Sequence, residues 1–291
     1  MFNSIAKRIE TRPNPIHIET VESETGANIA KCWTCGSCDF ECPVNIATNL
    51  LRPQVLVRLA AFGFLDELAN RREIWYCLDC RRCIQICPNC VKPASVVAFA
   101  REEGIRKGNF DKEAVRRYRI FFYRFQRVRW RTMDMCLKGG FDGISEDIWD
   151  EWLNTPVPEL DYSIHFPKSY KFSCVGAPTN ISSCFACGEC SSTCPISCER
   201  AVFDARSLVR MAAFGMTGVL LESPFIWLCL SCGRCSEACS QLVDICGMIR
   251  ELREKAFLDQ ILDSRFEVRM ERANRLILGR FIKEIDRIFG F

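Results

Sequence analysis

The spacing Cys-x-x-Cys-x-x-Cys-x-x-x-Cys occurs four times in this 291-residue chain, and these cysteine runs constrain its fold more than any other feature. The first two runs are Cys32, Cys35, Cys38, Cys42 and Cys77, Cys80, Cys83, Cys87. The last two are Cys184, Cys187, Cys190, Cys194 and Cys229, Cys232, Cys235, Cys239. A proline follows the fourth cysteine of three runs, and Ser240 follows Cys239. We expect each pair of runs to fold so that its thiols converge.

This spacing is the ligand pattern of [4Fe–4S] clusters, which need one thiolate at each of four iron corners. In two-cluster ferredoxins, the first three cysteines of a run bind one cluster and the fourth binds the neighbouring cluster. We therefore predict four [4Fe–4S] clusters with crossed ligation. The predicted ligand sets are Cys32, Cys35, Cys38, Cys87; Cys77, Cys80, Cys83, Cys42; Cys184, Cys187, Cys190, Cys239; and Cys229, Cys232, Cys235, Cys194.

Other uses of the cysteines explain the runs less well. A zinc site needs four ligands and would leave further cysteines of each run unused. A disulfide framework suits a small secreted domain, whereas this chain is long and its first residues lack the apolar core of a signal peptide. We therefore expect a reducing, cytoplasmic location. The net charge of +3 gives no reason to expect a nucleic-acid partner. No apolar stretch reaches the ~18 residues that would span a bilayer.

The chain repeats itself at an offset of 152 residues, which carries Cys32 onto Cys184. The segment from Leu56 to Gly63 returns as that from Leu208 to Gly215. We expect a tandem duplication of a two-cluster module. The predicted domains are 1–137, which ends with a basic helix, and 163–291, which ends with an amphipathic helix; the acidic, Gly- and Pro-containing residues 138–162 are the predicted linker.

The local patterns are mainly helical. Pro53 suits the first turn of a helix that ends near Gly63, and Pro93 begins another that reaches about Lys107. Ahead of each first run, Ile16-His17-Ile18 and Ile164-His165-Phe166 favour a short strand or β-hairpin, with structural rather than ligating histidines. Each pair of clusters should thus lie between helices.

The motif resembles the C subunit of heterodisulfide reductase, with two such subunits fused in tandem. The resemblance rests on the runs from Lys31-Cys32 through Cys42-Pro43 and from Trp75-Tyr76-Cys77 through Cys87-Pro88, and extends over roughly residues 30–108 and 182–255. It implies an α-helical ferredoxin fold. It also implies that the chain carries electrons between a flavin-bearing A subunit and a B subunit that reduces a disulfide.

The sequence shows no catalytic site of its own. It has no adjacent cysteine pair of the kind found in the B subunits, and no G-x-G-x-x-G fingerprint for a dinucleotide. We expect an electron-transfer subunit of a heterodisulfide-reductase-like complex. Two alternatives stay open: the iron–sulfur subunit of a membrane-docked dehydrogenase or quinone-linked reductase, and a protein that uses clusters only to stabilise its fold.

Several residues outside the runs have more than one interpretation. Five cysteines lie outside the runs: Cys90, Cys136, Cys174, Cys198 and Cys246. Cys90 and Cys198, just after fourth ligands, are expected to be small buried side chains, with alternate ligands or redox-active thiols as the other possibility. Arg81, Arg82 and Arg234 could raise cluster potentials or be solvated. Trp33, Trp75 and Trp227 are expected to shield clusters by packing.

Two segments of the sequence have the pattern of an amphipathic helix. Residues 116–131 place Phe121, Phe125 and Val128 on one helical face and arginines on another. We expect this helix to pack or to dock a partner, and contact with a membrane surface is the less favoured alternative because the apolar face is narrow. Residues 266–289 repeat the pattern and predict a partner-facing or domain-capping helix.

Overall fold

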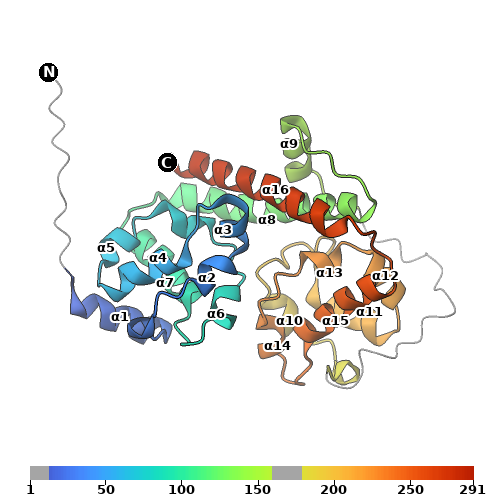
Figure 1. The fold of residues 1–291 in the computed structure, drawn as a ribbon, viewed down its shortest axis with the longest axis horizontal. Coiled ribbons are helices and arrows are strands. Elements are labelled where there is room, and N and C mark those ends of the chain that lie inside the picture. Colours follow the sequence, from blue (N-terminus) through green and yellow to red (C-terminus); the bar gives the residue numbers. More distant parts are fainter. Residues whose placement is uncertain (1–12, 159–178) are drawn as a thin grey trace. The chain divides into compact units, whose positions relative to one another are not determined.

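The computed structural model describes residues 13–158 and 179–291, and the regular elements within these ranges are all helical (Figure 1). The strand expected at Ile16-His17-Ile18 is wrong, because these residues form the first turn of α1 (Pro15–Thr25). The side chain of Asn14 accepts a hydrogen bond from the Ile16 N–H, and Pro15 occupies the first helical position. Both are helix-start signals that outweigh the short alternating pattern. The matching segment around His165 lies outside the described residues.

The chain divides into two compact units. Unit 1 runs to Lys112 and includes Phe291, and unit 2 comprises Glu113–Gly290. The elements of unit 1 are α1, η1 (Ile29–Lys31), α2 (Ser37–Phe40), α3 (Pro43–Thr48), α4 (Pro53–Ala61), α5 (Leu65–Leu68), η2 (Arg72–Tyr76), α6 (Arg82–Gln85) and α7 (Pro93–Arg106).

Unit 2 contains the second pair of cysteine runs and the long helices. Its elements are α8 (Lys112–Leu137), α9 (Glu146–Asn154), η3 (Ile181–Ser183), α10 (Glu189–Ser192), α11 (Ala205–Ala213), α12 (Thr217–Glu222), α13 (Phe225–Leu228), α14 (Arg234–Glu237), α15 (Ile245–Leu258) and α16 (Phe266–Phe289). The helices predicted from Pro53, from Pro93, over 116–131 and over 266–289 are thereby confirmed.

The duplication is visible in the helix boundaries. Shifting α2, α4, α6 and α7 by 152 residues gives the bounds of α10, α11, α14 and α15. The two copies differ after the fourth cysteine of the first run, where Pro43 begins α3 but the residues after Pro195 form turns. Each copy builds its core on the apolar faces of these helices. In unit 1, α4 packs against α7 through buried residues such as Leu56, Val57 and Val97.

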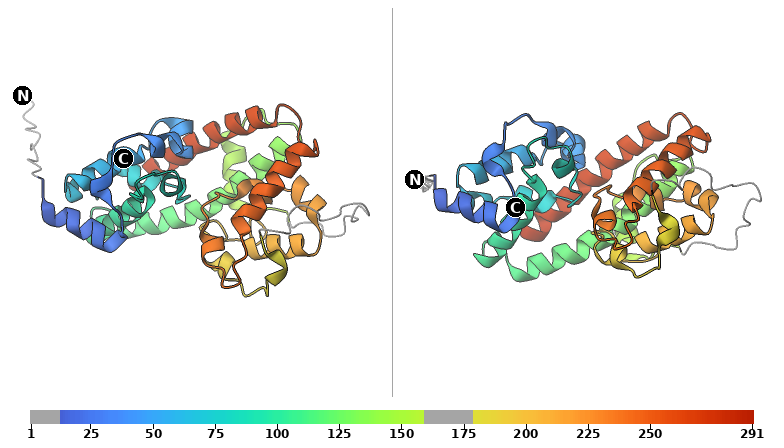
Figure 2. Two further views of the ribbon diagram at one scale, coloured as in Figure 1. Left: turned by 60° about the horizontal axis from the view of Figure 1, so that its bottom comes forward. Right: turned by 90° about the horizontal axis from the view of Figure 1, so that it is seen from below.

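The basic helix α8 groups with unit 2 (Figure 1, Figure 2). Its apolar face meets α16, where the Phe125 and Phe281 rings stack with centroids 4.6 Å apart, and α9, where Trp149 lies 6.0 Å from Phe125. The domain boundaries at 137 and 163 stay predictions. The structure adds that a helix, α9, forms within the expected linker and that α8 makes its contacts in the second unit.

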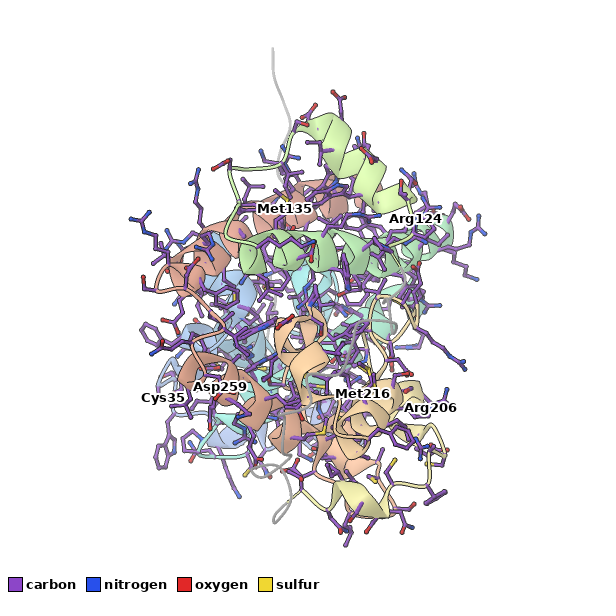
Figure 3. All side chains as sticks on the ribbon, turned by 90° about the vertical axis from the view of Figure 1, so that its right-hand side faces the viewer. Cys35, Arg124, Met135, Arg206, Met216 and Asp259 are labelled. Carbon is purple, nitrogen blue, oxygen red and sulfur yellow. The ribbon has the colours of Figure 1, made fainter. Side chains whose placement is uncertain are left out.

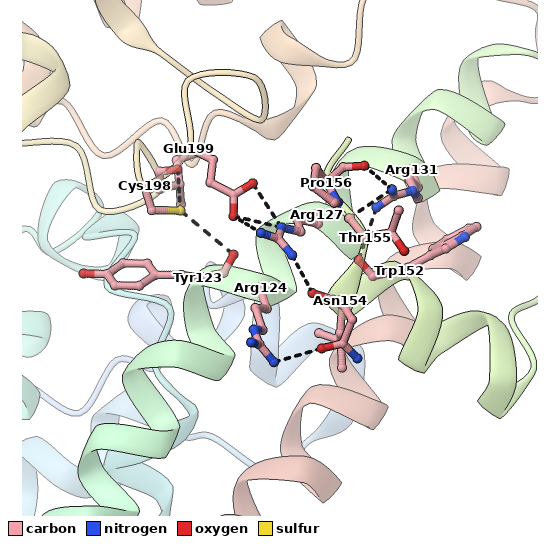
Figure 4. A network of polar contacts seen from close by, with 12 residues as sticks. Tyr123, Arg124, Arg127, Arg131, Trp152, Asn154, Thr155, Pro156, Cys198 and Glu199 are labelled. Carbon is pink, nitrogen blue, oxygen red and sulfur yellow. Dashed lines mark hydrogen bonds and ion pairs between the residues drawn. The ribbon is translucent and has the colours of Figure 1, made fainter. Parts of the chain in front are cut away.

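The arginines of α8 are used in hydrogen bonds within unit 2 (Figure 4). Arg127 pairs with Glu199, with Nε and the Glu199 carboxylate oxygens 2.8 and 3.0 Å apart, and also donates to the Leu153 carbonyl at 3.0 Å. Arg131 donates to the carbonyls of Thr155 and Pro156. Packing, which we expected for this helix, therefore occupies part of its basic face. Among the described helices, none combines the length and apolar character that crossing a membrane requires.

Candidate cluster-binding sites

In each unit the second cysteine run converges with the last cysteine of the first run. In unit 1, Cys42, Cys77, Cys80 and Cys83 line one cavity whose empty space is about 390 Å³, including the part open to solvent. In unit 2, Cys194, Cys229, Cys232 and Cys235 line the equivalent space of about 370 Å³. We call these the inner sites. The cysteines of two predicted ligand sets thus line shared cavities, each with the cysteine that crosses over from the other run. That they bind clusters as these sets stays a prediction.

The inner sites are apolar, and their cysteines lie close enough to raise one another's pKa values. Leu51, Val97 and Pro43 complete the wall in unit 1. Burial, with the charges of Cys77 and Cys80 adding to it, raises the pKa of Cys42 to about 12. Burial also raises the pKa of Cys194 to about 11. Four such thiols cannot all be thiolates unless a strongly cationic group compensates them. An iron–sulfur cluster supplies that charge, so the residues present fit it.

We call the regions around the first three cysteines of each first run the outer sites, and that these cysteines bind one cluster stays a prediction. Cys35 and Cys187 are exposed, and Cys35 is labelled at the surface in Figure 3. By contrast, Cys80, Cys83, Cys232 and Cys235 of the inner sites are buried. The α2 turn packs against α6, and α10 packs against α14, so the two runs of each pair lie together. That Cys87 and Cys239 complete the outer sites stays a prediction.

The loops that present the cysteines repeat one backbone geometry. In every run, the residue two positions after the first cysteine and the residue directly after the second cysteine have positive φ. These residues are Thr34, Gly36, Asp79, Arg81, Ala186, Gly188, Ser231 and Gly233. The loops also aim backbone N–H groups at sulfur: Asp79 donates to Cys77 Sγ at 3.4 Å and Ser231 to Cys229 Sγ at 3.3 Å. Such donors stabilise thiolate ligands.

An arginine holds each second run in place through hydrogen bonds to backbone carbonyls. The sequence alone did not lead us to expect this role. Arg101 donates to the carbonyls of Ile74 and Cys77, each at 2.6 Å, and its guanidinium lies 5.7 Å from the Trp75 ring centroid. Arg253 repeats these contacts with Ile226, Cys229 and Trp227. The signal was present, because the 152-residue offset carries Arg101 onto Arg253. These arginines position the first cysteine of each second run.

In each unit a side-chain hydrogen bond joins the first run to the start of the following helix. The donor and the acceptor positions are exchanged between the two units. In unit 1, buried Asp39 accepts from Arg52 Nε at 3.1 Å and from the Gln54 N–H at 2.8 Å. In unit 2, Ser191 occupies the place of Asp39 and donates to Asp204, which occupies the place of Arg52. The carboxylate belongs to the residue after the third cysteine in unit 1 and to the residue before α11 in unit 2. In both copies the contact holds the residue after the third cysteine against the start of α4 or α11.

Comparison with known proteins agrees with this geometry. The family described as the 4Fe-4S dicluster domain matches residues 28–91 and 180–243. The chain contains two 4Fe-4S dicluster domains in tandem. Each domain accounts for two clusters, so the chain has places for four. The first domain lies in unit 1 and the second in unit 2.

Several relatives are named as C subunits of heterodisulfide reductases. The chain is 32% identical over 91 residues to the iron-sulfur C subunit of the CoB–CoM heterodisulfide reductase of Methanopyrus kandleri, which covers 31% of this chain and 47% of the relative. It is 35% identical over 86 residues to the C2 subunit of the H2/formate:CoB-CoM heterodisulfide,ferredoxin reductase of Methanococcus maripaludis, covering 30% and 46%. It is 33% identical over 93 residues to an Archaeoglobus profundus protein named as similar to the heterodisulfide reductase C subunit, covering 32% and 50%.

The chain therefore spans about half the length of the relatives that it matches. No solved structure matches it. The expected tandem arrangement of two modules similar to the C subunit, and the expected α-helical fold, are confirmed.

The tryptophans next to the runs do not share one role. Trp75 and Trp227 are buried, as expected of side chains that exclude water from a site. Trp33, however, is 74% exposed, so the expectation that it packs over a cluster is wrong. Phe185 occupies the place of Trp33 in the second domain and is 61% exposed. Each outer site thus has an exposed aromatic side chain beside its first cysteine.

The remaining expectations concern single residues. His17 Nδ1 donates a hydrogen bond to the Gly63 carbonyl at 2.9 Å, which is a structural contact as expected. Cys136 is buried in α8, whereas Cys90 is exposed. Cys198 is half-buried, and Cys174 lies outside the described residues. Cys246 lines the inner site of the second domain.

Arg81 lines the inner site of the first domain, and its backbone is strained. Its φ is 54°, at a position where the other three runs have glycine. Left-handed backbone costs a residue other than glycine about 1 kcal/mol. We expect Arg81→Gly to stabilise the loop and, by removing a positive charge, to lower the reduction potential of this cluster. A redox titration followed by electron paramagnetic resonance (EPR) measures the change; an unchanged potential would mean that the Arg81 charge is screened by solvent.

Proposed function

We propose that the chain is an iron–sulfur electron-transfer subunit of a heterodisulfide-reductase-like complex. It relays single electrons between a flavoprotein and a subunit that handles thiols or disulfides. The names of the relatives support the complex, and the two dicluster domains support the role. Each bound [4Fe–4S] cluster takes up and releases one electron at a time. The chain's own residues hold the clusters and decide where a partner can approach them.

The observation that carries this proposal is the difference in exposure between the two sites of each domain. The outer sites have exposed Cys35 and Cys187, each near an exposed aromatic side chain. In each inner site at least two of the four cysteines are buried and none is exposed. A partner protein can therefore dock close to each outer site, while the protein interior separates the inner clusters from solvent. Aromatic side chains are enriched in the energetically dominant parts of protein interfaces, which suits Trp33 and Phe185 to docking.

The two domains give the chain two such docking points, one for an electron donor and one for an acceptor. The alternative of a membrane-docked reductase relied on the basic face of α8. Arg127 and Arg131 of that face are engaged with Glu199, Leu153 and nearby carbonyls in unit 2, which favours packing over membrane contact.

The proposal is tested by purifying the complex from its native host without oxygen and identifying what accompanies the chain. We expect a flavoprotein and a subunit with adjacent cysteine pairs. A membrane anchor with quinone-dependent reduction of the clusters would instead support the alternative function. Clusters that cannot be reduced and reoxidised within a catalytic turnover would leave them a purely structural role.

Within that complex, Trp33→Ser and Phe185→Ser form a matched pair. We expect one variant to slow reduction of the clusters by the flavoprotein and the other to slow their reoxidation, each by about tenfold, the scale of losing one interface anchor. Stopped-flow absorbance measures both rates. Leu258→Ser, at the 82% exposed last residue of α15, serves as the control. Iron content should stay unchanged in all three, and unchanged rates in both aromatic variants would contradict the docking assignment.

A further inference from the structure

The inner site of the second domain contains one cysteine more than that of the first. Cys246 lines it together with Cys194, Cys229, Cys232 and Cys235. The position 152 residues earlier is Ala94, which lines the inner site of the first domain. Ile249 and Val97, one turn further along α15 and α7, also line the two sites. Cys246 and Ala94 therefore occupy the same place in the two copies, and only one of them can bind iron.

Contacts specific to the second domain fasten Cys246 beside the third cysteine of the run. The Cys246 N–H donates to Ser236 Oγ at 2.9 Å, and Ser236 directly follows Cys235. The Ser236 hydroxyl in turn donates to Asp244 Oδ1 at 2.8 Å, and Asp244 also accepts from the Gly247 N–H at 2.9 Å at the start of α15. The first turn of α15 is thus joined to the loop that presents Cys235.

The first domain cannot form this link. Ile84 stands in the place of Ser236 and has no hydroxyl group, and Lys92 stands in the place of Asp244 and has no acceptor. The second domain also needs a glycine at position 247, because a side chain there would collide with the Asp244 carboxylate. The fifth cysteine and the contacts that hold it therefore occur together in one copy and are both missing from the other.

The charges within the site agree with this placement. Burial is the main cause that raises the pKa of Cys235, and the charges of Cys229 and Cys246 come next, ahead of those of Cys232 and Cys194. Cys246 therefore lies close enough to Cys235 for its charge to affect the pKa of that thiol.

We propose that Cys246 is a fifth potential ligand of the inner cluster of the second domain and can take the place of Cys235. In the exchange, the Cys246 thiol gives up its proton and its sulfur binds iron, while the sulfur released from Cys235 takes up a proton. One iron–sulfur bond forms and one breaks, with no change in electron count or in iron and sulfide content. This inner site therefore tolerates the loss of a ligand, and the inner site of the first domain does not.

The duplicated chain provides its own control. We expect Cys235→Ala to keep the iron and the [4Fe–4S] EPR signals of four clusters. Cys83→Ala, the same change in the first domain, should lose one cluster and about a quarter of the iron. Cys235→Ala with Cys246→Ala should lose as much as Cys83→Ala. Adding Ala94→Cys to Cys83→Ala should restore part of the lost iron. An equal loss in Cys235→Ala and Cys83→Ala would overturn the proposal and leave Cys246 a small buried side chain.

A second measurement leaves every run intact, so it does not depend on whether a ligand variant folds. Ferricyanide oxidation strips one iron from a [4Fe–4S] cluster whose iron can lose a ligand, and EPR detects the [3Fe–4S] product. We expect Cys246→Ala to yield more of this product than the native chain, whereas Ser240→Ala should not. An equal yield from the native chain and Cys246→Ala would contradict the proposal. Iron content and EPR signals do not depend on any partner, so they can fail without affecting the proposed function.

Discussion

Removing the iron is expected to unfold both dicluster domains while the α8–α16 pair keeps its helical structure. The inner thiols have raised pKa values because they are buried, so without iron they are neutral and no longer link the two runs. The elements that carry them, such as η2 and α6, are only five and four residues long, too short to be stable helices on their own. Helices α8 and α16 instead share an apolar contact built on Phe121, Phe125 and Phe281, which contains no predicted ligand.

Hydrogen exchange after treatment with a chelator under reducing conditions measures this difference. Peptides that cover residues 72–90 and 225–240 should lose protection, and peptides within α8 and α16 should retain it. Native chain kept with its iron is the control. Retained protection around the inner sites would mean that packing alone holds the cysteine runs in place.

The second large effect is expected from Arg101→Met. Methionine keeps much of the length of the side chain but removes both hydrogen bonds to the Ile74 and Cys77 carbonyls, as well as the interaction with Trp75. A hydrogen bond from a charged group contributes about 1.5–3 kcal/mol, and each carbonyl would lose the bond from Arg101. We therefore expect unit 1 to lose about 3–5 kcal/mol of unfolding free energy.

Chemical denaturation of the anaerobically purified protein, followed by the cluster absorbance, measures that loss. Arg253→Met should produce the same effect in the second domain. Arg116→Met removes an exposed arginine that pairs with Glu113 within one turn of α8, and it should change stability little. If Arg101→Met unfolds at the same denaturant concentration as the control, the arginine does not hold the second run.

The cysteine spacing and the 152-residue repeat were enough to predict the helical tandem and the convergence at the inner sites. They failed at α1, where the alternation in Ile16-His17-Ile18 suggested a strand although Asn14 and Pro15 signal a helix start. They also failed at Trp33, because an apolar residue next to a ligand need not face the core.

The roles of other residues could not be predicted from the sequence and became clear only in the structure. The offset pairs Arg101 with Arg253, but only the contacts show that both fasten a ligand loop. The offset likewise pairs Cys246 with Ala94, yet their position on the wall of a site depends on how α15 and α7 pack. Sequence periodicity predicts which face of a helix is buried and does not specify what that face meets.

The central claim is that the two runs of each domain exchange their fourth cysteines, and counting iron in paired variants tests it most directly. With crossed ligation, Cys42 and Cys80 serve one cluster, so Cys42→Ala with Cys80→Ala should lose no more than either change alone, about a quarter of the iron. Cys35→Ala with Cys42→Ala should remove two clusters and about half of the iron. The opposite pattern, with the first pair losing half and the second a quarter, would show that each run binds its own cluster and would contradict the account.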